Sequence, residues 1–120
     1  MAEHSPLRDA CEEIADTLTV AGLPTNTNPD RVGPRQAAIF PTGISFDRLG
    51  GDEFTLTVDV YALANNRDTQ PVVMDTLWSA LAIVRRVYEA PEAEAVTFEL
   101  PAGVQLPGLR IPLTLTVTKE

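Results

Sequence analysis

The first pattern along the chain is a stripe of apolar residues at helical spacing. Its members are Leu7, Ala10, Cys11, Ile14, Ala15 and Leu18, and acidic residues occupy the opposite face. Ser5 followed by Pro6 is typical of a helix start, because serine caps free N–H groups and proline lacks one. Gly22 is typical of a helix end. These signals predict an amphipathic helix over residues 6–21.

A second and wider helical stripe runs from Gln70 to Glu89. It consists of Val73, Met74, Leu77, Trp78, Leu81, Val84 and Tyr88, and it is widened by Ala80 and Val87. Asp68 or Thr69 can cap this helix. The stripe is broader than one narrow packing seam requires. Two interpretations stay open: the whole stripe packs tightly across a sheet, or part of it meets another subunit.

Strict alternation of apolar and polar residues predicts the strands. The cleanest run spans residues 54–63, a closing run spans 111–118, and a shorter run spans 96–100. Residues 37–40 and 44–46 form either two short strands or one kinked strand, because proline and glycine interrupt them. Residues 48–52 favour a hairpin connection, residues 101–103 a turn, and the proline-rich residues 24–35 an extended connector.

This order of elements predicts one α+β domain over residues 1–120, with residues 1–5 flexible. Strands joined by short turns favour an antiparallel or mixed sheet, here of about four strands, and the two helices must cover one of its faces. We therefore expect a two-layer sandwich. Its second face would present Thr55, Thr57, Thr114, Thr116 and Thr118, a polar and β-branched surface.

Charge and composition restrict the classes of function. The net charge is −8, with nine Lys and Arg against seventeen Asp and Glu, and only Arg85 and Arg86 are adjacent basic residues. This balance argues against sequence-specific DNA binding. No apolar run reaches the roughly 20 residues of a membrane span. Residues 1–8 lack the regions of a signal peptide, so we expect synthesis in a cytoplasm without membrane association.

The residue types also argue against common catalytic sites. His4 is the only histidine and Cys11 the only cysteine, which leaves no Cys/His zinc set, no catalytic dyad and no intrachain disulfide. Cys11 lies on the apolar stripe of the first helix and is expected to be a small buried residue. Asp59 is the least trivial acid, and a salt bridge or solvation explains it. We expect no enzyme activity, no metal site and no cofactor.

Three segments stand out in this order of elements: Pro29-Asp30-Arg31-Val32 with Pro34, Val58-Asp59-Val60-Tyr61, and the helix from Leu77 to Val87. With these segments the sequence resembles the tail terminator, or tail completion, proteins of long-tailed bacteriophages, particularly those of actinobacterial hosts. The likeness covers about Leu7 to Val117. It rests on chain length, the order of the elements and these segments.

The resemblance implies a structural virion protein that forms a ring, usually a hexamer, on the finished tail tube. Such a ring ends tube polymerisation and provides the surface to which the head docks. The implied partners are further copies of the chain, the tail tube protein and a head-completion or connector protein. Genome DNA would pass through without specific binding. The implied location is the tail or neck of the virion, after synthesis in the host cytoplasm.

A closed ring needs two different contact patches on each subunit. The candidates are the threonine-rich sheet face with Tyr61 and Leu63, the connector with Asp30, Arg31 and Arg35, and the loop with Asn66 and Arg67. Three alternatives stay open: a head–tail joining (neck) protein of the same assembly, a small acidic ligand-binding or DNA-mimicking regulatory module, and an enzyme of unrecognised type.

Overall fold

The computed structural model describes residues 5–28, 31–46, 53–100 and 103–118 of the chain. The elements are α1 (Pro6–Ala21), β1 (Thr25–Asn26), β2 (Ala37–Ser45), β3 (Glu53–Leu63), α2 (Gln70–Val87), β4 (Glu94–Glu99) and β5 (Gln105–Thr118). The strands form one five-stranded sheet in the order β1-β2-β3-β5-β4. The predicted α+β class is therefore confirmed.

Both ends of α1 follow from local sequence signals. The Ser5 side-chain oxygen accepts a hydrogen bond from the Arg8 N–H at 3.0 Å. At the other end Gly22 adopts a φ of 115°, and its N–H bonds to the last carbonyls of the helix. Only glycine adopts this left-handed geometry at little cost. The predicted bounds of the first helix are confirmed.

The connector over residues 24–35 contains a short strand that the sequence did not reveal. Thr25 and Asn26 pair in parallel with Ala37 and Ala38 of β2, and the Ala37 N–H donates to the Pro24 carbonyl at 2.8 Å. This two-residue strand makes the sheet mixed. It raises the strand number to five, against the expected number of about four.

The strand β2 is one continuous strand and not two short ones. It runs unbroken over Ala37–Ser45 and pairs antiparallel with β3, with a bulge between Pro41 and Gly43. A bulge admits one extra residue and bends the strand without ending it. The predicted hairpin connection at residues 48–52 lies outside the described residues.

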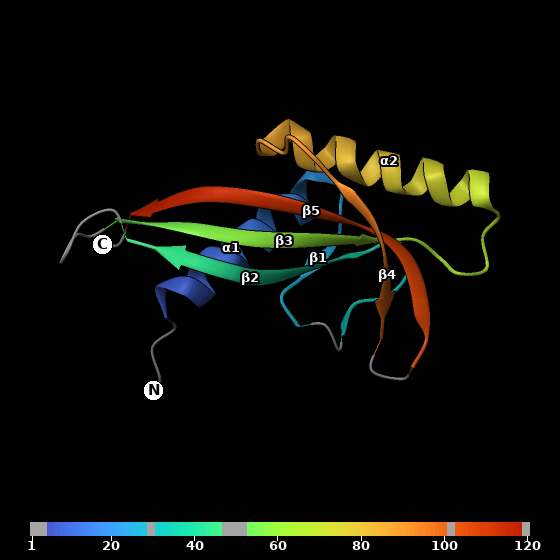
Figure 1. Ribbon diagram of the computed structural model, residues 1–120, viewed down its shortest axis with the longest axis horizontal. Coiled ribbons are helices and arrows are strands. Elements are labelled where there is room, and N and C mark those ends of the chain that lie inside the picture. The colour runs from blue at the N-terminus through green and yellow to red at the C-terminus, as the bar shows by residue number, and fades with distance from the viewer. Residues whose placement is uncertain (1–4, 29–30, 47–52, 101–102, 119–120) are drawn as a thin grey trace.

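The main core lies between the two helices and one face of the sheet. Figure 1 shows α1 behind the long strands and α2 along the β5 side of the sheet. Alternate residues of the central strand β3, from Phe54 to Ala62, face this core together with Ile111 and Leu113 of β5. Leu18 of α1 and Val84 of α2 are fully buried there. The helices thus cover one face, as expected.

A second and smaller core lies on the opposite face of the sheet. Val32 from the connector, Ala38 of β2, Leu63 of β3 and Leu106 of β5 are all buried in it. This core forms because the connector and the β4–β5 hairpin both pack against that end of the sheet. The second face is therefore polar over only part of its length, whereas the alternation alone predicted a polar face throughout.

Candidate interaction surfaces

The structure separates the predicted interface residues into exposed and buried ones. Arg31, Arg35, Asn66 and Arg67 are exposed. Asp30 lies outside the described residues. Leu63 is 1% exposed and belongs to the second core, so its inclusion in a surface patch was wrong. The physical reason is tertiary: the packing of Val32 and Leu106 covers this position of β3.

Tyr61 is half-buried rather than free on the sheet face. Its ring lies 5.5 Å from Phe40 in an edge-on arrangement and 5.4 Å from Phe98, centroid to centroid. Burial and the carboxylates of Asp59 and Glu94 raise the pKa of the Tyr61 phenol, although Arg110 acts in the opposite direction. Tyr61 is therefore largely a packing residue of the second core.

Two of the predicted patches meet in one surface, which we call the arginine loop (Arg35, Asn66, Arg67 and Asp68). The Arg35 guanidinium lies 3.3 Å from the Asp68 carboxylate. The Arg35 N–H donates to the Leu63 carbonyl at 2.9 Å while its backbone adopts a φ of 63°. The Asn65 side chain accepts a hydrogen bond from the Arg67 N–H at 3.0 Å, which holds the tip of the loop. Connector and loop therefore present their charges together.

The other predicted patch is the threonine face, which consists of Thr55, Thr57, Thr114 and Thr116. The strand register places Thr55 beside Thr116 and Thr57 beside Thr114 on β3 and β5. The first two are half-buried and the last two exposed. None of these four threonines belongs to either hydrophobic core cluster of the described residues. The predicted polar, β-branched surface is therefore present at this end of the sheet.

A chain of charges lies across the second face, next to the second core. Asp59 is 7% exposed, and its carboxylate lies 3.7 Å from the Arg110 guanidinium. Arg110 also lies 3.7 Å from the Glu94 carboxylate on β4. The arrangement ties three neighbouring strands together. The salt bridge expected for Asp59 is thus present.

Groups suited to chemistry are dispersed over the described residues. Cys11 is buried on α1, and burial, followed by the nearby Glu12 carboxylate, raises the pKa of its thiol. Within the described ranges no three His, Cys, Asp or Glu side chains gather in a way that could hold a metal ion. A hollow between α1 and β5 contains one carboxylate, that of Glu13, among mainly apolar side chains.

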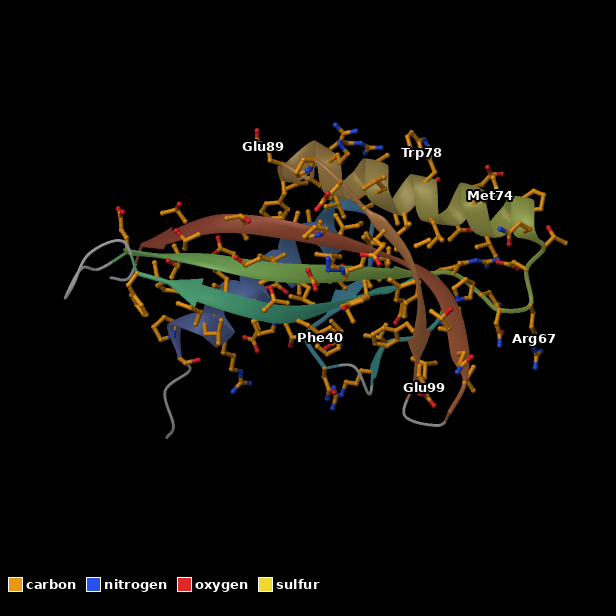
Figure 2. The ribbon with its side chains drawn as sticks, viewed as in Figure 1. Phe40, Arg67, Met74, Trp78, Glu89 and Glu99 are labelled. Atoms are coloured by element: carbon orange, nitrogen blue, oxygen red, sulfur yellow. The ribbon has the colours of Figure 1, made fainter. Side chains whose placement is uncertain are left out.

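The wide stripe of α2 divides into a buried part and an exposed part. Val73, Leu77, Ala80 and Val84 are buried against the sheet. Met74 and Trp78 are 58% and 68% exposed. Figure 2 shows Trp78 pointing away from the sheet. The interpretation that the whole stripe packs across the sheet was therefore wrong. The breadth of the stripe was the sequence signal for this exposed surface.

Comparisons with known proteins add no relationship to this picture. No model of a protein family matches the sequence, and no curated protein matches it significantly. In the part of the chain that the structure describes, no helix is both long enough and apolar enough to cross a membrane.

Proposed function

We propose that the chain is a structural subunit that assembles head to tail into a closed ring on a bacteriophage tail tube. The ring would end tube polymerisation and offer a docking surface to the head. This function follows the resemblance to tail terminator proteins. The self-assembly part also has support from the surfaces of the molecule.

The observation that carries the proposal is the separation of two unlike surfaces along the molecule. Strand β3 has the threonine face in its first half, and the chain reaches the arginine loop soon after the strand ends. The nine residues from Thr55 to Leu63 are separated by eight steps, which span roughly 26 Å of extended chain. Figure 2 shows Arg67 at the end of the long axis beyond β3. A head-to-tail contact requires two such different patches on one subunit.

The charge of the chain suits a ring through which DNA passes. A net charge of −8 repels phosphate groups. Basic side chains retain DNA because they bind its phosphates and release the counterions there. An acidic inner surface makes no such contacts and therefore does not retain the genome. The acidity that argued against a DNA-binding protein is therefore compatible with a DNA conduit.

A mixing experiment tests the head-to-tail arrangement. Thr114→Arg places a long charged side chain on the threonine face, and Arg67→Ala removes a charged side chain from the arginine loop without creating a partner for the introduced arginine. Each variant alone should fail to form rings on tail tubes. In a mixture, the intact threonine face of the Arg67 variant can contact the intact arginine loop of the Thr114 variant. The two remaining surfaces of such a pair are both altered, so no ring should form. Thr97→Arg, which changes an exposed strand threonine outside both surfaces, serves as the control and should leave ring formation unchanged.

Ring formation by both single variants would contradict the use of these surfaces. Binding of the wild type to a portal or adaptor protein, without binding to tail tubes, would instead favour a head–tail joining role.

A further inference from the structure

The outer face of α2 exposes a tryptophan and a methionine side by side. Met74 and Trp78 lie one helical turn apart, and the half-buried Leu81 follows on the same side of the helix. Trp78 is the only tryptophan of the chain. Large apolar side chains grouped on an exposed helix face are typical of a contact with another protein.

Two neighbouring rows of side chains form this outer face. The first, which we call the apolar row after its apolar members, consists of Met74, Trp78 and Leu81 and ends at Arg85. The second, which we call the small row, has Ser79 and Ala82 at its centre, with Asp75 at one end and Arg86 at the other. Both rows have the spacing i, i+4, i+7, i+11 that keeps residues on one side of a helix. Eleven residues complete about three turns, so the first and last members of a row lie roughly 16 Å apart.

When a row is reversed, its members lie opposite one another about the midpoint of the row. The apolar row has its midpoint between Ser79 and Ala80 and the small row between Ala80 and Leu81, only about 1.5 Å apart along the helix, so one two-fold axis beside Ala80 can serve both. In an antiparallel second copy across that axis, Asp75 would face Arg86, and the same charge pair would occur a second time. Trp78 would meet Leu81 of the second copy in the apolar row. In the small row Ser79 would meet Ala82, which would permit close approach of the two helices.

The charges on this face are available for such pairing. In the described part of the chain, Asp75, Arg85 and Arg86 take part in no ion pair. Asp75 and Arg86 cannot pair within one helix, because three turns separate them. An antiparallel second copy brings opposite charges together at both ends of the contact and buries the apolar side chains between them.

We propose that α2 pairs with α2 of a second copy of this chain, antiparallel across a two-fold axis. This contact goes beyond the proposed ring and uses neither the threonine face nor the arginine loop. A two-fold contact is self-complementary, whereas the contact that closes a ring is not. The pairing therefore joins two subunits, or two rings through their subunits, and does not build the ring.

Tryptophan fluorescence during dilution is the first test, with sedimentation velocity measured in parallel. Trp78 emission should shift to shorter wavelength as the concentration rises, and the shift should follow the formation of dimer. Dimer formation without a change in Trp78 emission overturns the proposal. So does a wild-type protein that stays monomeric at every concentration in the absence of tail tubes.

Charge reversal then tests the antiparallel geometry. Asp75→Arg or Arg86→Asp alone places like charges together at both ends and should weaken dimerisation about tenfold or more. A mixture of the two variants should recover dimers, because each heterodimer pairs opposite charges at both ends. A mixture that stays as weak as the single variants overturns this arrangement.

Matched reversals on α1 serve as the control. Asp16→Arg and Arg8→Asp change exposed charges of the same kinds and should leave dimerisation unchanged. The outcomes also separate the two proposals. Loss of α2 pairing with intact capping of tail tubes contradicts neither, and is the result expected for Asp75→Arg. Loss of capping in the Thr114→Arg variant, with the Trp78 shift preserved, assigns ring closure to the other surface.

Discussion

The Arg110 Nη1 atom lies 3.7 Å from the Asp59 Oδ2 atom, across the neighbouring strands β5 and β3. Asp59 is almost fully buried, so this guanidinium is the positive charge that balances its carboxylate. Glu94, also 3.7 Å from Arg110, is exposed and remains solvated. The Asp59–Arg110 pair is therefore expected to stabilise the sheet, and it contributes little to the charge of the surface.

Arg110→Ala should lower the free energy of unfolding by about 2 kcal/mol, because a buried carboxylate loses its partner. Asp59→Asn should cost less, since it removes the buried charge itself. The double variant should be more stable than the sum of the two losses predicts. Urea denaturation of the four proteins measures this. An Arg110→Ala protein as stable as the wild type would contradict this role.

Tyr61→Ala should destabilise the fold by roughly 2–3 kcal/mol, because it removes a half-buried ring from between Phe40 and Phe98. Tyr61→Phe is the matched control and should be close to neutral, since it keeps the ring contacts. Thermal denaturation of both variants measures the difference. Equal stability of the two would show that the ring contributes little to the second core.

Gly108→Ala should destabilise the sheet by about 1–3 kcal/mol through overpacking. A Cβ atom at this position would lie 2.7 Å from the Ala62 carbonyl oxygen and 3.1 Å from the Leu63 side chain. The control is Gly43→Ala, because an added Cβ there meets nothing within 4 Å. Chemical denaturation should show a loss for Gly108→Ala alone. Similar losses in both variants would argue against the close approach of β5 and β3.

Alkaline pH should weaken the fold through Cys11. The pKa of its thiol is raised above the ordinary value of 9.0, chiefly by burial. This contribution to stability is fully present below about pH 9 and is lost as the pH rises through the raised pKa, because the unfolded chain ionises first. Cys11→Ala should reduce the loss of stability over that range. An unchanged pH dependence in this variant would exclude the Cys11 thiol as its source.

Elements with strong local signals could be predicted from the sequence. The first helix was predicted with its bounds because Ser5, Pro6 and Gly22 act within one turn of its ends. The alternation from Phe54 to Leu63 predicted β3. A segment that becomes a strand only through its pairing partner has no local sequence signal. For this reason β1 and the start of β5 at Gln105 were not predicted as strands. These segments become strands because β2 and β4 supply hydrogen-bond partners.

The candidate surfaces were predictable only where burial depends on local periodicity. The threonine face needed no more than the alternation of two strands. Leu63 has the same periodicity, yet contacts with residues distant in sequence, Val32 and Leu106, bury it. Trp78 was placed on a stripe too wide for one seam. Which edge of that stripe stays exposed depends on the position of α2 over the sheet.

Native mass spectrometry of the protein, alone and with tail tubes, shows whether the chain forms a capping ring. We expect a closed oligomer, with a subunit number that fits a six-fold ring, bound at the end of each tube. Tubes capped in this way should stop growing. A protein that remains strictly monomeric at high concentration, and also in the presence of tail tubes, would contradict the proposed function.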